Sequence, residues 1–193
     1  KPDHLYKMAY EKRRAFDYGG WLMMYPMSDF PYWRLHMKHR QARGLNYESF
    51  THPPKDLLKF VLNELRERGP LGNRDFEGTK VKAWSYRGRK ETSIALFYLW
   101  LTGEVMISNR KGFDRIYDLR ERVVPPEFDY AATEEETIEF MSKKIIAFLG
   151  MIRENRLGTE LSYYIHREVS RENAKRLVHQ LIEKGAVSRV GVE

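Results

Sequence analysis

The sequence predicts a mainly α-helical protein with small β-hairpins, in the α+β class. Apolar residues recur at helical spacing in several segments, and Gly or Pro ends most of these segments. Two stretches of the chain also share one order of elements: a long helix, a turn with Leu-Gly, a short helix, a long helix and a strand. Because Pro53-Pro54 and Pro125-Pro126 interrupt this order, we expect a connecting segment at 1–52 and two modules at 53–126 and 127–193.

The connecting segment is rich in aromatic residues and methionine. Ser28 or Asp29 can cap a helix that begins with Pro31 and ends near Gly44. Cations recur along this helix, which predicts an amphipathic helix with a basic face formed by Arg34, Lys38, His39, Arg40 and Arg43. Asp17 is interpreted as an ion-pair partner of the nearby Arg13-Arg14 rather than as a catalytic carboxylate.

The first module begins with a helix whose apolar residues between positions 57 and 65 share one face, and Gly69-Pro70 ends it. A short helix is expected at residues 74–76, and a long one from about Arg89 to Thr102. Residues 94–101 within the long helix are apolar almost all round, which is typical of a buried helix. We therefore expect the long helix to pack against another part of the protein.

A β-hairpin follows the long helix. Residues 105–107 predict a strand, residues 109–112 a turn with two cations and a glycine, and residues 113–117 the returning strand. Four charged residues of alternating sign come next: Asp118, Arg120, Glu121 and Arg122. We interpret them as ion pairs that fix the hairpin to the next module.

The second module begins with a capping box, in which the side chains of Thr133 and Glu136 each accept a hydrogen bond from the other residue's backbone amide. The helix that follows has apolar residues at helical spacing. It is expected to bury Ile138, Met141, Ile145, Phe148 and Leu149.

The remainder of the second module predicts two more helices. Leu157-Gly158 opens a short helix that ends near His166. Ser170 caps the last helix, and Gly185 ends it. Residues 186–192 then predict a strand.

The order of helices and hairpin is that of a winged helix, so we expect tandem winged helices, the second truncated at its wing. Winged helices bind DNA through the third helix and the wing, and some dock proteins instead. Lys and Arg on these elements would contact phosphates and give an affinity that depends on salt and not on sequence. The candidate DNA-binding residues are Arg34, Lys38, Arg87, Arg89, Lys90, Arg110, Lys111, Arg115, Arg171, Lys175 and Arg189.

The composition restricts the possible partners and cofactors. The 193 residues include 34 Lys and Arg against 27 Asp and Glu, and the net charge of +7 favours a polyanionic partner. The chain has no cysteine, so disulfides and thiolate chemistry are excluded. The histidines lack metal-ligand spacing, no phosphate-binding glycine loop occurs, and the longest apolar run is too short for a membrane span. We expect no metal, no cofactor and no membrane contact, and a monomer because sustained heptads are lacking.

Several motifs together resemble a known family. They are Phe16-Asp17-Tyr18, Tyr25-Pro26-Met27-Ser28-Asp29-Phe30-Pro31, Arg74-Asp75-Phe76, Leu99-Trp100-Leu101-Thr102-Gly103-Glu104 and the run from Gly112-Phe113 through Tyr117-Asp118-Leu119 to Glu121-Arg122-Val123-Val124-Pro125. On these motifs, which span almost the whole chain, the sequence is similar to the bacterial crosslink-repair DNA glycosylases of the YcaQ/AlkZ group.

The resemblance implies three tandem winged helices and a C-terminal β domain that form a concave surface for double-stranded DNA. It implies hydrolysis of the N-glycosidic bond of alkylated or crosslinked bases, in the cytoplasm of a bacterium and at the nucleoid. It also implies a Gln-x-Gln or Gln-x-Asp pair that places the attacking water. Gln41 is followed by Ala42-Arg43 and Gln180 by Leu181-Ile182, so neither glutamine fits. We therefore expect a fragment without the N-terminal module and the β domain, inactive by itself, with its catalytic residues outside this chain.

The alternative is a non-enzymatic protein of tandem winged helices. It would be a transcription regulator that binds DNA or a module that docks other proteins. A Gln-x-Gln or Gln-x-Asp pair upstream of Lys1 would favour the glycosylase, and the lack of such a pair would favour the alternative.

Overall fold

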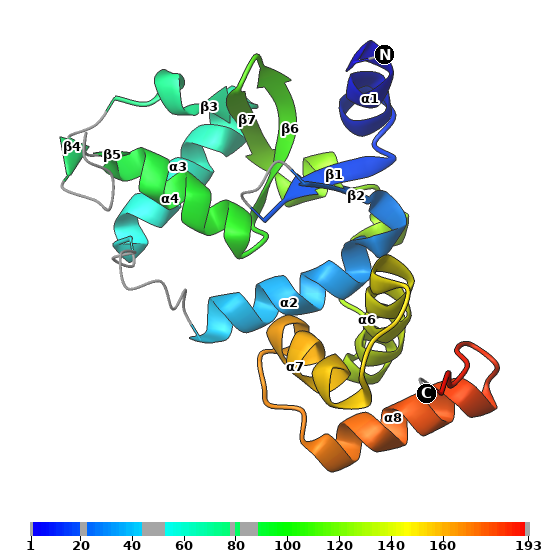
Figure 1. Ribbon diagram of the computed structural model, residues 1–193. Helices are drawn as coiled ribbons and strands as arrows, with labels where there is room; N and C mark the ends of the chain where they lie inside the picture. Colours follow the sequence, from blue (N-terminus) through cyan, green and yellow to red (C-terminus); the bar gives the residue numbers. More distant parts are fainter. Residues whose placement is uncertain (1, 20–22, 44–52, 78–79, 82–88, 192–193) are drawn as a thin grey trace. The chain divides into compact units, whose positions relative to one another are not determined.

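The computed structural model describes residues 2–19, 23–43, 53–77, 80–81 and 89–191 (Figure 1). The described part of the chain is mainly helical with small antiparallel sheets, which confirms the predicted class. The chain divides into two compact units, Lys1–Tyr130 and Ala131–Glu193. No helix in the described ranges combines the length and apolar character that crossing a lipid bilayer requires.

The first unit begins with a short helix α1 (Pro2–Tyr6) and a π-helical turn η1 (Lys7–Glu11). Strand β1 (Ala15–Tyr18) pairs antiparallel with β2 (Met23–Pro26), and a 3-10 turn η2 (Met27–Asp29) leads into helix α2 (Phe30–Arg43). The β1 side chains are buried, and the rings of Phe16 and Tyr18 contact aromatic rings of α2 and α4. The aromatic residues of this segment therefore form a core.

Two arginines that were predicted to lie on an exposed basic face of α2 do not lie there. Arg34 and Arg40 are buried. Arg34 Nη1 donates to the carbonyl oxygen of Thr102 at 2.9 Å, and Arg40 Nη1 donates to Tyr18 Oη at 3.3 Å. Lys38 on the same helix is exposed. The helix turns these arginines inward because carbonyl and hydroxyl acceptors of the aromatic core lie within reach there.

The middle of the first unit follows the predicted order of helices and hairpin. Its elements are α3 (Lys55–Arg68), β3 (Leu71–Gly72), the 3-10 turn η3 (Asn73–Asp75), β4 (Lys80–Val81), β5 (Arg89–Lys90), α4 (Glu91–Leu101), β6 (Val105–Lys111) and β7 (Asp114–Leu119). As predicted, α4 is largely buried, with Trp100 fully enclosed. Leu71-Gly72, expected as a turn, is instead a short strand that pairs with β7, so the sheet has the order β3-β7-β6.

The hairpin β6–β7 is longer than predicted, and its turn is shorter. Lys111 pairs with Asp114, which leaves Gly112 and Phe113 as the two loop residues. A bulge at Ser108 lies between Ile107 and Asn109. β6 also contacts β1, which lies beside it in Figure 1. The hairpin is therefore supported along the β6 edge by the N-terminal segment.

Three of the four alternating charges at the end of the hairpin form ion pairs, and these pairs lie within the first unit. α5 (Arg120–Val123) and a 3-10 turn η4 (Pro126–Phe128) follow the hairpin. Arg120 pairs with Asp129 at 2.8 Å, and Arg122 pairs with Asp118 at 3.4 Å and donates to the carbonyl oxygen of Leu65 at 2.9 Å. These contacts fix the end of the hairpin to α3.

The second unit contains α6 (Glu134–Leu149), α7 (Glu154–Ile165) and α8 (Arg171–Glu183). The capping box of α6 is confirmed, since Thr133 Oγ1 accepts from the Glu136 amide at 3.2 Å and Glu136 Oε2 accepts from the Thr133 amide at 2.8 Å. Met141 and Ile145 are buried as expected, whereas Phe148 is 89% exposed and Leu149 41%. The prediction that Phe148 and Leu149 are buried was therefore wrong, because these two side chains face solvent.

Two further expectations for the second unit are wrong. Leu157-Gly158 lies inside α7, which begins at Glu154, so the supposed Leu-Gly turn is helical. A Cβ at Gly158 would lie 3.1 Å from Ala174 Cβ, so glycine here lets α7 and α8 approach closely. Residues 186–191 are not a strand, and residues 192–193 lie outside the described part. The predicted strand has no described neighbour with which to pair.

Candidate nucleic-acid interface

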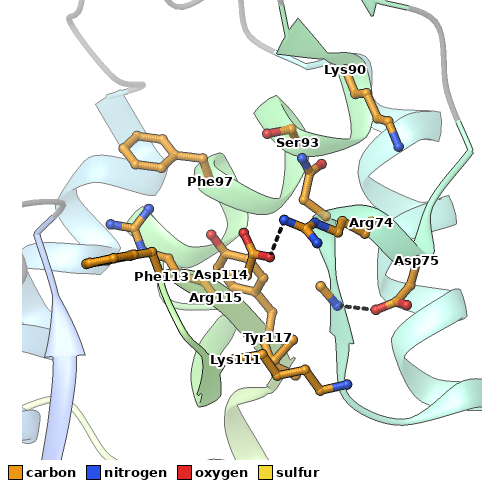
Figure 2. A pocket seen from close by; sticks show the side chains of 13 residues that line it. Arg74, Asp75, Lys90, Ser93, Phe97, Lys111, Phe113, Asp114, Arg115 and Tyr117 are labelled. Carbon is orange, nitrogen blue, oxygen red and sulfur yellow. Dashed lines mark hydrogen bonds and ion pairs between the residues drawn. The ribbon is translucent and has the colours of Figure 1, made fainter.

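A groove in the first unit lies between η3, the beginning of α4 and the β6–β7 hairpin, and its volume is about 610 Å³. We call it the hairpin groove (Figure 2). Its lining includes Arg74, Lys90, Phe97, Lys111, Phe113 and Arg115. The groove thus joins side chains from three elements that are distant in the sequence.

Cations outnumber carboxylates around the hairpin groove. Among the described residues that line it, the cations are Arg74, Lys90, Lys111 and Arg115, and the carboxylates are Asp75 and Asp114. Asp114 pairs with Arg74 at 3.0 Å, and Asp75 Oδ2 accepts from the Gly72 amide at 2.7 Å, as drawn in Figure 2. Because both carboxylates are engaged within the module, the surplus of positive charge remains for an anionic ligand.

Arg115 is held by the aromatic core beneath the groove. Its guanidinium carbon lies 4.7 Å from the centroid of the Trp100 ring, a cation–π geometry. Its Nε is buried and has no hydrogen-bond partner among the described residues. Burial raises the pKa of the neighbouring Tyr117, and the charge of Arg115 opposes that rise. Arg115 therefore lines the groove with its guanidinium packed on the Trp100 ring.

Arg110, predicted as a wing contact to DNA, is held within the protein. Its Nε and Nη2 donate to Asp17 Oδ2 at 2.8 and 2.5 Å. Burial acts to lower the pKa of Arg110, but the hydrogen bond and the charge of Asp17 outweigh burial, so its pKa is raised. The interpretation of Asp17 was therefore right about a structural ion pair and wrong about the partner. Arg13 donates to the carbonyl oxygen of Ser108 instead, at 2.8 Å.

A second basic groove lies in the second unit, with a volume of about 870 Å³. We call it the α8 groove, and its lining includes Arg153, Arg171, Lys175, Val178, Ile182 and Arg189. Glu154 pairs with Arg189 at 2.5 Å across exposed surface. The lining of the α8 groove therefore combines cations with apolar side chains.

The structure brings six of the predicted residues into these two grooves. Lys90, Lys111 and Arg115 line the hairpin groove, and Arg171, Lys175 and Arg189 line the α8 groove. Lys38 is exposed on α2, Arg34 is buried and Arg110 is paired with Asp17. Arg87 lies outside the described residues, and so does the side chain of Arg89.

Sequence reasoning missed Arg74, Arg153 and Phe113. Arg74 lies in the predicted short helix, where a cation close to the hairpin was a usable signal. Arg153 precedes α7 in a segment without regular structure, so nothing marked it. Phe113 occupies a hairpin turn, where an aromatic residue is unusual. An aromatic residue at this position therefore indicated a role other than forming the turn.

Three or more His, Cys, Asp or Glu residues placed to hold a metal ion do not occur in the described ranges. The chain has a surplus of cations in two grooves, which is the chemistry that recognises a polyanion. No solved structure matches the chain. The sequence matches the family described as DNA glycosylase AlkZ-like over residues 1–193. Because this match covers the entire chain, the protein belongs to the AlkZ-like DNA glycosylase family, as its motifs predicted.

Proposed function

We propose that this chain is the DNA-binding part of a monofunctional DNA glycosylase that hydrolyses the N-glycosidic bond of alkylated or crosslinked bases. Its family is one of DNA glycosylases, which supports a role in DNA repair with DNA as the partner. The observation that carries the proposal is the convergence of Arg74, Lys90, Lys111 and Arg115 on one groove beside the hairpin. The residues of the α8 groove would bind a second stretch of the sugar-phosphate backbone.

In such a reaction the cations would supply the binding energy that offsets the cost of exposing a base. Exposing a base in a duplex costs a few kcal/mol, and electrostatic contacts to phosphates can offset that cost. In the hydrolysis, water adds its oxygen to the sugar carbon, the bond from that carbon to the base nitrogen breaks, and the base leaves with a proton. The chain holds no Gln-x-Gln or Gln-x-Asp pair to place the water. Its own residues therefore bind and orient the DNA.

Salt titrations test the binding. A labelled duplex is titrated by fluorescence anisotropy between about 50 and 200 mM salt, where loss of phosphate contacts lowers affinity steeply. Lys111→Ala and Lys175→Ala are each expected to reduce the slope of log affinity against log salt by about 1. Lys55→Ala is the matched control, because Lys55 is exposed and lines neither groove.

Equal slopes for all three variants would contradict the assignment of the grooves. Wild-type binding that does not respond to salt would contradict DNA binding altogether.

Base release tests the reaction. A duplex with an alkylated purine is incubated with the protein, and the free base is separated by chromatography. We expect release by a polypeptide that joins this chain to a module with the glutamine pair, and no release by the 193 residues alone. Tight duplex binding without release by the joined polypeptide would support the non-enzymatic alternative.

A further inference from the structure

The tip of the β6–β7 hairpin carries a phenylalanine in solvent. Phe113 is 90% exposed, the largest exposed fraction among the described large hydrophobic side chains. The pairing of Lys111 with Asp114 makes Gly112-Phe113 the two-residue loop, and Gly112 has φ 61°. Glycine with positive φ at the first loop position, followed by a residue with negative φ, suits a type II′ turn.

The turn does not need an aromatic residue at this position. Glycine supplies the backbone conformation, and the second loop position is usually Asn, Asp or Ser. The ring of Phe113 contributes little buried area to the fold, because almost all of it lies in solvent. Single exposed apolar residues are common on protein surfaces and need no explanation by themselves. Phe113 differs from such residues because the hairpin that carries it is held in place by contacts with other elements.

The hairpin that carries Phe113 is braced on both sides. On the β6 side, Arg110 pairs with the buried Asp17 at 2.5 Å, and Arg13 donates to the carbonyl oxygen of Ser108 at 2.8 Å. On the β7 side, Tyr117 and Ile116 pair with Leu71 and Gly72 of β3. Such rigidity matters for a side chain that inserts between stacked bases. Separating the bases costs a few kcal/mol, and a mobile loop would bend before the bases separate.

Cationic side chains lie close to Phe113 on the hairpin and in the groove. Lys111 is exposed next to it, and Arg115 lies two residues further along β7. All three residues line the hairpin groove. An aromatic ring among cations is the combination that binds stacked bases together with phosphates, because every base has a flat face for stacking. An apolar surface of a partner protein could cover the Phe113 ring, but it would offer no anions to these cations.

We propose that the Phe113 ring inserts into the base stack of the duplex that the hairpin groove binds. The inference rests on the proposed function, since it requires bound DNA. Lys111, Arg115 and the rest of the groove hold the phosphates, and the braced hairpin drives the ring between neighbouring bases. The insertion unstacks the bases at the bound site, so that a damaged base is exposed.

The test uses a duplex with 2-aminopurine, whose fluorescence rises when its neighbours unstack. The intact chain is expected to raise this fluorescence, and Phe113→Ser is expected to abolish the rise and weaken binding about tenfold. Phe113→Trp is expected to retain the rise, with quenching of its own indole emission by the bases. Phe148→Ser is the matched control, because Phe148 is equally exposed at 89% but lies in the second unit.

The outcomes separate this inference from the proposed function. Equal thermal unfolding of wild type and Phe113→Ser verifies the fold, as expected for an exposed side chain in a turn that serine also fits. If Phe113→Ser keeps the fluorescence rise and the affinity while Lys111→Ala weakens binding, the insertion of Phe113 is contradicted and the proposal of DNA binding stands. If the wild type binds no duplex at all, both proposals fail.

Discussion

Two buried or half-buried arginines of the first unit differ from two exposed arginines of the second unit in what they contact. In the first unit, Arg34 and Arg110 point inward, and Arg110 is held by an Asp17 side chain that is only 1% exposed. In the second unit, Arg167 pairs with Glu134, and Arg189 with Glu154, on surface that water reaches. The inward arginines join strands and helices, whereas the outward ones remain accessible to a ligand.

This contrast shows that a count of basic residues overstates the phosphate contacts of a chain. A guanidinium that already donates to a buried carboxylate cannot turn to a phosphate without leaving that carboxylate unpaired. An exposed pair exchanges its partner at little cost, since it contributes at most about 1 kcal/mol. The salt dependence of DNA binding should therefore follow the exposed cations of the two grooves.

The most direct test of the difference between buried and exposed arginine pairs is to remove one paired carboxylate from each unit. Asp17→Asn leaves the Arg110 charge partly buried without its partner, and we expect the free energy of unfolding to fall by about 3 to 5 kcal/mol. Glu134→Gln removes an exposed pair and should cost less than about 1 kcal/mol. Urea denaturation followed by circular dichroism measures both. Equal losses would show that burial of the pair is irrelevant.

A second pair of variants compares two glycines that end helices. Both Gly103 after α4 and Gly150 after α6 have positive φ, at 74° and 73°. A Cβ at Gly103 would lie 2.5 Å from Met37 Sδ and 2.8 Å from Arg34 Nη1, whereas nothing lies within 4 Å of a Cβ at Gly150. Gly103→Ala adds overpacking to the left-handed strain and should cost about 3 kcal/mol.

Gly150→Ala carries the left-handed strain alone, and we expect a cost of about 1 kcal/mol. The midpoints of thermal unfolding compare the two variants. A larger shift for Gly150→Ala than for Gly103→Ala would contradict the crowded contact between α2 and the end of α4.

The smallest expected effect concerns pH in the second unit. Hydrogen bonds from Lys143 and then Lys184 lower the pKa of Glu139 from its ordinary 4.5 to about 2. The stability from this contact is fully present above pH 4.5 and is lost as pH falls toward 2. Its size is below about 1 kcal/mol, because solvent screens the exposed pairs. Urea midpoints of wild type and Glu139→Gln should differ at pH 6 and converge near pH 2.

Local signals predicted much of the fold. The capping box at Thr133 and Glu136, the Ser170 cap of α8 and the glycine after α3 all act where the sequence placed them. Each signal depends on residues within one turn of helix, so the sequence contains all of its parts. The buried α4 was also predictable, because a helix that is apolar all round must be covered.

Features that depend on distant partners escaped prediction. The strand Leu71-Gly72 forms only because Ile116 and Tyr117 of β7 lie opposite it. Helical spacing at Phe148 indicated burial, but its side chain is exposed, and periodicity alone does not say which positions a neighbouring element covers. The grooves were predictable only in part, since the list of cations was available but their division between inside and outside was not.

The sequence by itself determined the mainly helical class, several helix caps, the hairpin and the family, because these depend on patterns within short segments and on motifs along the chain. Only the tertiary structure decided that Arg110 meets Asp17, 93 positions away, and that Lys90, Lys111 and Arg115 share one groove. The physical reason is that the state of a charge depends on burial and on its partner, and both are fixed by how distant segments pack.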